Sequence, residues 1–344
     1  MTRCGLVPIL ILGGIGNILN ILVFNRKVLR FTSCSVYLLA ASVVNLLSLS
    51  FGIIPSIYTI NRINPDTYSM IYCKLGLYFL HASLMMGRSY LVLACIDRCT
   101  LCSPVSKIRD FSQIKVARRL VPAVIIIWFI IPAHIPTFNT IQNRQCLRPG
   151  SYDLIYSIYS LIVAGLLPPV MMGIATILTY KNLRQIRQRI NPVRMIDSSR
   201  VRIRQRDYQI MIMLMAQVIV YVISTLAYPV DVFYGALTRH VVKSAEEQAV
   251  EKFCSFMAGG FLIYLDTASS FYVYYFTSTT FRHDVQRLMM NCGLKYFPKI
   301  NVLRMRRNTI NIQPTAMQHE RIIIANKMSN HNEKLNNHQD KVNE

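Results

Sequence analysis

The chain has few charged residues and very few acidic ones. Only 16% of its 344 residues are charged, and 16 Asp and Glu stand against 38 Lys and Arg. A soluble globular chain carries about 25% charged residues. Together with 53% hydrophobic residues and a mean hydropathy of +0.34, this deficit excludes an ordinary soluble domain and indicates lipid as the solvent.

The sequence also lacks the motifs of enzymes. It has no metal-ligand spacing, no glycine-rich phosphate loop and no nucleophile motif, so we expect no enzyme activity, no cofactor and no metal site. The Gly13-Gly14-x-Gly16 cluster lies inside an apolar run, where small residues serve close helix packing. Nine cysteines are too few for a disulfide scaffold, and at most one or two bridges are expected.

The excess of basic residues gives a net charge of +22, which often indicates nucleic-acid binding. Here the basic residues lie between long apolar runs rather than on a soluble domain. Orientation in a membrane is therefore the better explanation, and no nucleic-acid partner is predicted.

Seven apolar runs are long enough to cross a membrane, since a span needs about 20 residues. Two of them carry one charge near the middle, Arg88 and Asp266. The runs are Gly5–Asn25, Thr32–Asn61, Leu75–Ile96, Leu120–Asn143, Leu154–Tyr180, Tyr208–Val230 and Phe253–Phe281. The sequence therefore predicts an all-α fold, a seven-transmembrane helix bundle.

The first run has a second interpretation as a cleaved signal peptide, because Arg3 precedes it. The run is long, contains Asn17 and Asn20, and ends at basic residues rather than at a cleavage site, so a membrane span is favoured. With the N-terminus outside and the C-terminus cytoplasmic, the inner segments hold 29 of the 38 basic residues, as the positive-inside rule requires. These segments are 25–34, 97–119, 181–207 and 282–344.

Apolar residues recur at helical spacing after the seventh run, at Phe281, Val285, Leu288 and Met289. This pattern predicts a short amphipathic surface helix over 281–291. Cys292 follows it and is a candidate for lipidation. We expect a membrane domain over 1–292 and a disordered cytoplasmic tail over 293–344, which is rich in Asn, His, Gln and Lys.

Short motifs stand at regular places in these runs. They are Gly16-Asn17 in the first, Ile96-Asp97-Arg98-Cys99 at the end of the third with Pro104 after it, and Trp128 in the fourth. Pro168, Pro169 and Pro229 follow in the fifth and sixth, and Ser270-Phe271-Tyr272-Val273-Tyr274 with Phe281-Arg282 in the seventh. In order and spacing, over roughly residues 5–292, they resemble the rhodopsin-like (class A) G-protein-coupled receptors.

The resemblance implies an extracellular ligand, a heterotrimeric G protein as partner, and roles for particular residues. Cys73 and Cys146 match the disulfide of the family's outer side. Asp97 and Arg98 match its G-protein-coupling pair, and Tyr274 matches a switch residue of the seventh helix. The alternatives are an ordinary interfacial arginine whose side chain reaches water and an interfacial tyrosine anchor.

Several positions depart from the family pattern. Asn45 stands where the family has the Asp of its sodium site, and Cys99 replaces the Tyr of Asp-Arg-Tyr. Ala227 replaces the tryptophan near the sixth-helix proline, and Ser270-Phe271 replaces Asn-Pro. A receptor-like protein with weak or no ligand-driven signalling therefore remains an alternative.

Charge is found instead at Arg88 and Asp266, where an unpaired ionisable side chain costs several kcal/mol. We expect these two residues either to pair or to share a polar, water-filled site with Asn17 and Asn45. In the alternative, Arg88 pairs with Asp231. A transporter would need inverted repeats or several such charges, and the sequence has neither.

Two ligand classes are excluded by single positions. Leu80 stands where amine receptors carry an Asp, and Ile263-Tyr264 stand where opsins carry the retinal-binding Lys. A peptide ligand remains, and the layout resembles invertebrate neuropeptide receptors of the FMRFamide-like kind in the plasma membrane. The predicted ligand-binding residues, each of which also fits simple packing, are His81, Met85, Asp231, Tyr234 and Phe256.

Overall fold

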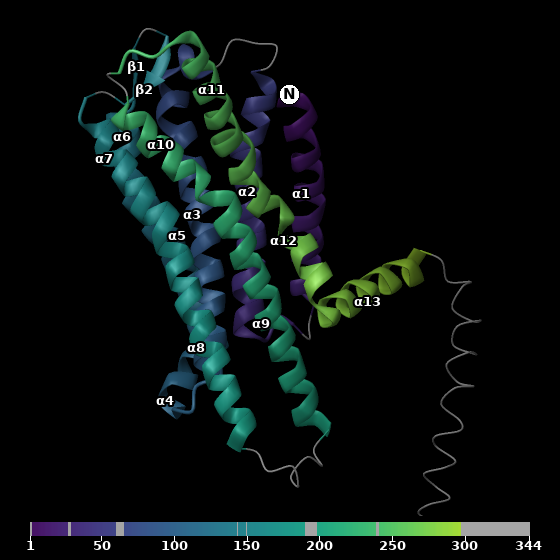
Figure 1. The fold of residues 1–344 in the computed structure, drawn as a ribbon. Coiled ribbons are helices and arrows are strands. Elements are labelled where there is room, and N and C mark those ends of the chain that lie inside the picture. The colour runs from purple at the N-terminus through teal and green to yellow at the C-terminus, as the bar shows by residue number, and fades with distance from the viewer. Residues whose placement is uncertain are drawn as a thin grey trace, which may run out of the picture. The chain divides into compact units, whose positions relative to one another are not determined.

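The computed structural model describes residues 2–26, 29–59, 65–142, 144–148, 150–189, 198–238 and 241–296. Within these ranges, the side chains of 2–4, 183, 185–189, 198–207 and 291–296 are not described. The chain divides into two units, residues 1–285 and 286–344. The first unit holds a helical bundle (Figure 1).

Long helices make up most of the first unit, and shorter segments join or extend them. The long ones are α1 (Thr2–Phe24), α2 (Ser33–Tyr58), α3 (Met70–Leu101), α5 (Ile114–Ile130), α8 (Leu167–Arg189), α9 (Ser198–Thr225) and α12 (Ile263–Thr277). The shorter ones are η1 (Pro65–Thr67), α4 (Ser106–Arg109), η2 (Asp110–Ser112), η3 (Ile131–Ala133), α6 (His134–Phe138), α7 (Tyr152–Tyr159), η4 (Ser160–Leu166), α10 (Ala227–Leu237), α11 (Ala245–Ser255) and η6 (Phe256–Leu262).

Six helices of the described residues are long and apolar enough to cross a membrane. They cover Gly5–Phe24, Ser33–Tyr58, Met70–Leu101, Ile114–Phe138, Tyr152–Asn182 and Tyr208–Leu237. The seventh predicted run is also helical, as α11, η6 and α12 in succession. Its α12 carries Asp266 and many Ser, Thr and Tyr residues, and its role as a membrane span stays a prediction.

The bundle buries polar side chains and exposes apolar ones. Asn17, Asn20 and Ser48 are fully buried, whereas Ile126 and Ile223 are 60% and 71% exposed. A soluble protein would show the reverse, because water would penalise so many exposed aliphatic side chains. The distribution therefore agrees with lipid around the bundle.

Small residues let neighbouring helices approach closely. A Cβ at Gly13 of α1 would lie 2.7 Å from the Cβ of Ala268 on α12. A Cβ at Gly52 of α2 would collide with the hydroxyl of Tyr264. The glycines thus bring α1 and α2 against α12, as small residues do at membrane helix interfaces.

A short hairpin adds two strands that the all-α prediction did not include. β1 (Thr140–Gln142) pairs antiparallel with β2 (Gln145–Leu147), with Ile141 opposite Cys146. Three-residue strands are too short to show an alternating pattern, so no sequence pattern predicted them. The hairpin lies at the same end of the bundle as the N-terminus (Figure 1).

The helix after α12 is longer than predicted. α13 runs over Thr279–Tyr296, whereas the surface helix was expected over 281–291, and its lipid-facing character stays a prediction. The side chain of Cys292 lies outside the described residues, as does the predicted tail from residue 297 onward. The predicted boundary between residues 292 and 293 therefore remains a prediction as well.

Candidate functional site: two cavities and a buried ion pair

The C-terminal end of α3 carries a buried ion pair. The guanidinium of Arg98 donates to Asp97 Oδ2 from Nη2 at 2.5 Å and from Nε at 3.0 Å. Arg98 and Asp97 are only 5% and 1% exposed. A pair this enclosed is held more firmly than a surface ion pair, because removing one member leaves an uncompensated buried charge.

The same carboxylate also connects α3 to the loop that follows it. Asp97 Oδ1 accepts a 2.9 Å hydrogen bond from the hydroxyl of Ser112 in η2. The backbone carbonyl of Ser112 in turn accepts from the hydroxyl of Ser33 at the start of α2. Asp97 is therefore fixed from two sides and holds Arg98 in one position.

Tyr274, the predicted switch residue, is buried near the C-terminal end of α12. Its ring packs edge-on against Phe24 of α1 and Phe281 of α13, with centroids 6.2 and 5.8 Å away. Tyr274 also lines a small cavity of about 20 Å³ in the middle of the bundle. The residue thus lies between an aromatic cluster and a polar space.

This polar cavity brings together most of the predicted intramembrane site. Arg88, Asn45 and Asp266 all line it, with Gln217 of α9 and Ser270 of α12. Its volume is enough for one water molecule. Within the described residues Arg88 forms no ion pair with Asp266 or Asp231, so Arg88 and Asp266 share the polar cavity without forming an ion pair.

Asn17, the fourth predicted member, lies beside the cavity and joins three helices. Its amide donates to the carbonyl oxygens of Gly13 and Thr267 at 2.8 and 3.0 Å. Its Oδ1 accepts from Asn45 at 3.3 Å and from Ser270 at 3.4 Å. The asparagine therefore connects α1 to α2 and α12.

Asp266 is held by a residue that the sequence analysis did not single out. Gln217 Nε2 donates to Asp266 Oδ1 at 2.7 Å, and so links α9 to α12. Gln217 Oε1 is buried and has no partner among the described residues. Gln217 is the one amide in the middle of the apolar run Tyr208–Val230, whose other glutamine, Gln209, stands at its start. That central position was the sequence signal that could have identified Gln217.

Arg88 contacts a backbone carbonyl that two prolines leave without its helical donors. In a helix the Ala164 carbonyl would accept from residue 168, or from residue 169 in a π-helical turn, and both are proline. The carbonyl instead accepts from Tyr221 Oη at 2.7 Å and from Arg88 Nη1 at 3.4 Å. One oxygen of η4 therefore holds α3 and α9 together.

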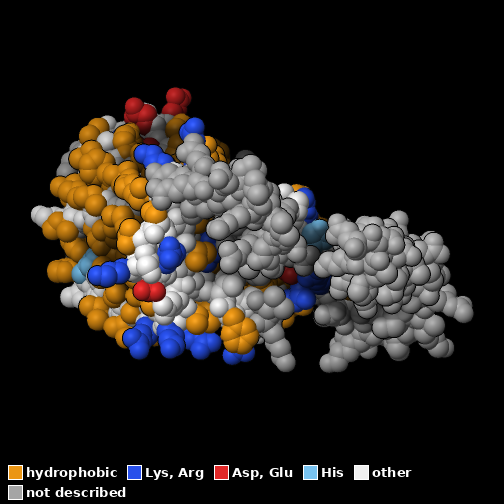
Figure 2. Space-filling view, turned by 90° about the horizontal axis from the view of Figure 1, so that it is seen from below, with side chains coloured by type: hydrophobic (Ala, Val, Ile, Leu, Met, Phe, Trp, Pro, Cys, Tyr) orange, Lys and Arg blue, Asp and Glu red, His pale blue; other side chains and the backbone are white. Residues whose placement is uncertain are grey.

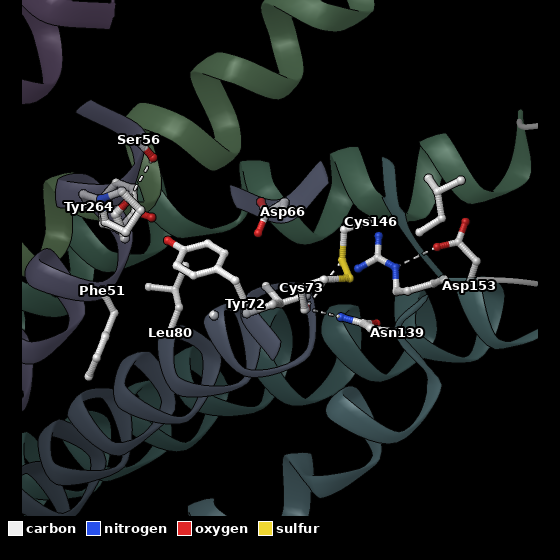
Figure 3. A pocket seen from close by; sticks show the side chains of 16 residues that line it. Phe51, Ser56, Asp66, Tyr72, Cys73, Leu80, Asn139, Cys146, Asp153 and Tyr264 are labelled. Atoms are coloured by element: carbon white, nitrogen blue, oxygen red, sulfur yellow. Dashed lines mark hydrogen bonds and ion pairs between the residues drawn. A yellow bond between two sulfur atoms is a disulfide. The ribbon is translucent and has the colours of Figure 1, made fainter. Parts of the chain in front are cut away.

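The end of the bundle that carries the hairpin contains a larger cavity of about 490 Å³, open to the surface, which we call the outer cavity. The predicted disulfide between Cys73 and Cys146 is confirmed and fixes the hairpin to α3 beside this cavity (Figure 3). Leu80 and Tyr264 form part of its wall. Arg148 and Asp153 also line it and form an ion pair of 2.9 Å.

None of the five predicted ligand-binding residues is among those that line this outer cavity. His81 and Met85 are buried below it, where His81 Nε2 lies 3.1 Å from the hydroxyl of Tyr159. Met85 Sδ lies 3.4 Å from Arg88 Nη1. Both belong to the packed interior of α3.

The other three lie on α10 and at the first residue of η6. Asp231 accepts a 2.9 Å hydrogen bond from the hydroxyl of Ser255, and Phe256 packs against Gly260. Tyr234 is half exposed, with the ammonium of Lys243 at 5.3 Å from its ring centroid.

Lys243 itself is engaged by a second partner. Its ammonium lies 2.6 Å from Glu251 Oε1, and this hydrogen bond holds the pKa of the partly exposed Glu251 carboxyl below its ordinary value.

Within the described residues, no three His, Cys, Asp or Glu side chains come together to hold a metal ion. The functional features are therefore two cavities and the Asp97–Arg98 pair.

The chain belongs to the rhodopsin family of seven-transmembrane receptors, whose family model matches residues 16–265. A comparison with curated proteins finds no match. Members of the family are receptors rather than enzymes, so the chain is a multi-pass membrane protein with a receptor's signalling function. The class assigned from the motifs is confirmed, whereas the neuropeptide resemblance remains a prediction.

Proposed function

We propose that the chain is a peptide receptor of the plasma membrane that activates a heterotrimeric G protein. Its N-terminus lies outside, its C-terminus is cytoplasmic, and α11, η6 and α12 form the seventh span. The observation that carries the proposal is the buried Asp97–Arg98 pair at one end of a bundle whose other end contains an open cavity.

Arg98 is the residue through which the receptor reaches the G protein. In the described state both members of the pair are buried and Asp97 is held by Ser112. Ligand binding favours a second state in which α9 moves outward and Arg98 is released, and the ligand shifts this equilibrium by its differential affinity for the two states. Such a receptor carries out no covalent chemistry.

The walls of the two cavities are about one helical turn apart along α3. This closeness supports a direct effect of a ligand in the outer cavity on the residues of the polar cavity. Leu80 lines the outer cavity and Leu84, four residues later on α3, lines the polar one. Tyr264 lines the outer cavity and Asp266 lines the polar one. A ligand that displaces Tyr264 therefore acts on the Gln217–Asp266 hydrogen bond that holds α9.

A peptide fits the outer cavity better than the small ligands excluded above. Its volume lies within the usual range for ligand pockets, and its wall combines aromatic, aliphatic and charged side chains. The cavity holds one end of the peptide, and a longer peptide extends over Asp231, Tyr234 and Phe256 at the outer ends of α10 and η6. His81 and Met85 act from beneath as packing residues.

The experiment is a screen of a synthetic neuropeptide library on cells that express the chain, with G-protein activation as the readout. Surface expression of every variant is measured with an antibody tag. We expect a response to at least one peptide, and its loss in Tyr264→Ala but not in Tyr272→Ala, whose side chain contacts α1 and does not line the outer cavity. A chain that reaches the cell surface but responds to no peptide would favour the alternative, a receptor-like protein with weak or no ligand-driven signalling.

A further inference from the structure

Three basic side chains stand on one face of α5 at its first two turns. Lys115, Arg118 and Arg119 follow each other at helical spacing, so their Cβ atoms lie about 5–6 Å apart. All three are exposed, and within the described residues they form no ion pair or hydrogen bond. We call these three residues the basic stripe.

The stripe is electrostatically unfavourable in the protein alone. Cations near a helix N-terminus oppose the helix dipole, and α5 has no acidic residue in its first turn. The nearest acid in the preceding segment, Asp110, already accepts a 3.2 Å hydrogen bond from Gln113. An anion from outside the chain would therefore be stabilised at the basic stripe.

The same face of α5 continues as an apolar surface. Pro122, Ile126 and Ile130 follow Arg119 at helical spacing, and Ile126 and Ile130 are 60% and 67% exposed. The opposite face, with Ala117, Val124 and Trp128, is buried. An anionic group at the stripe is thus continuous with a surface that suits hydrocarbon chains.

We propose that the basic stripe binds the headgroup of an anionic phospholipid whose acyl chains lie along Pro122, Ile126 and Ile130. The anionic cytoplasmic leaflet supplies such lipids and attracts nearby basic residues. Figure 2 looks onto this end of the bundle, where Lys and Arg side chains stand beside hydrophobic ones and outnumber acidic ones. The inference depends on the proposed orientation, but not on the peptide or on the G protein.

A lipid fits this surface better than a protein partner does. The stripe and its apolar continuation run along the side of the bundle, opposite the face that packs on α3 through the Trp128–Ser89 hydrogen bond of 2.7 Å. A cytoplasmic protein approaches the end of the bundle instead. Only a molecule with a charged group and long apolar chains covers both parts.

The test uses the full chain in nanodiscs that contain phosphatidylcholine and phosphatidylserine in equal amounts, followed by native mass spectrometry of the retained lipid. Each basic residue near an anionic surface contributes roughly a fivefold factor in affinity. We expect K115Q/R118Q/R119Q to weaken phosphatidylserine retention at least tenfold relative to phosphatidylcholine. The charge-conserving K115R/R118K/R119K should retain it.

The matched control removes three other exposed charges at the same end, in K107Q/K181Q/R184Q. Retention in this control should stay within about twofold of the original chain. An equal loss of phosphatidylserine retention in both triple variants would overturn the proposal, because it would show an effect of overall surface charge rather than of the basic stripe. Unchanged lipid retention in K115Q/R118Q/R119Q together with lost G-protein activation would overturn it in favour of a protein partner.

Discussion

Gln217 of α9 donates a 2.7 Å hydrogen bond to the carboxylate of Asp266 on α12, in the middle of a membrane protein. The two residues line the same small polar cavity as Arg88 and Asn45. A hydrogen bond to a charged group is worth about 1.5–3 kcal/mol. The pair therefore holds α9 in place in a chain in which Ala227 and Ser270-Phe271 replace the family's usual tryptophan and Asn-Pro.

The first prediction concerns this hydrogen bond. Gln217→Met keeps the volume but leaves Asp266 without its donor, so we expect higher ligand-independent G-protein activation and a lower thermal unfolding midpoint. Gln209→Met is the control, because Gln209 lies on the same helix and accepts only an exposed hydrogen bond from the Thr279 amide. Equal basal activity in Gln217→Met and the original chain would contradict the proposed role.

The second prediction concerns the Ala164 carbonyl. Tyr221→Phe removes a hydrogen bond worth about 0.5–1.5 kcal/mol, and should lower the thermal unfolding midpoint. Tyr272→Phe, whose hydroxyl bonds the Leu12 carbonyl at the surface, should change it less. Pro168→Ala restores a helical donor to Ala164 and should reduce the effect of Tyr221→Phe. Additive effects of the two substitutions would argue against competition for one oxygen.

The third prediction concerns the two buried charges. Arg88→Met leaves Asp266 uncompensated, and Asp266→Asn removes that charge while keeping an acceptor for Gln217. The double variant should therefore unfold at a higher temperature than Arg88→Met alone, with a coupling of about 1 kcal/mol or more.

Swapping the charges is a separate test of direct pairing. Arg88→Asp with Asp266→Arg should not restore surface expression, because an aspartate at position 88 cannot donate to the Ala164 carbonyl. Full rescue by the swap would show that the direct ion pair, which is not seen in the described state, is the form that matters.

The fourth prediction concerns the outer disulfide. Cys73 and Cys146 are 73 residues apart, and closing a loop of that length stabilises by up to about 4 kcal/mol in the chain-entropy model. Cys73→Ser should lower the thermal unfolding midpoint and abolish the peptide response, because the hairpin beside the outer cavity is no longer held. Cys254→Ser, at an exposed free cysteine, should behave like the original chain.

The features that could be predicted from the sequence were those that depend on a local sequence pattern. Apolar runs located the long helices, and motif order located Cys73, Cys146 and the Asp97–Arg98 pair. Hydrophobic patterning predicts membrane spans well, because backbone N–H and C=O groups in lipid must form their hydrogen bonds within the helix itself. The seventh run was found in the same way, although its polar content sets it apart from the other six.

Contacts between distant segments were not predictable in the same way. Arg88 and Asp266 were identified as unusual because each is a single charge in an apolar run. Their partners depend on how α3, η4 and α9 pack, and no sequence pattern specifies that Ala164 offers its carbonyl to Arg88. The outer cavity was missed for the same reason, since its wall comes from α2, α3, α12 and the hairpin.

The most direct test of the G-protein mechanism needs no ligand. Asp97→Asn keeps an acceptor for Ser112 but loses the charge that holds Arg98, so the purified chain should accelerate nucleotide exchange on a purified heterotrimeric G protein about fivefold, a shift of roughly 1 kcal/mol. Adding Arg98→Ala should abolish this gain, and Asp110→Asn, at an exposed acid of the same loop, should leave exchange unchanged. Exchange that is the same in the original chain, Asp97→Asn and the double variant would contradict the mechanism.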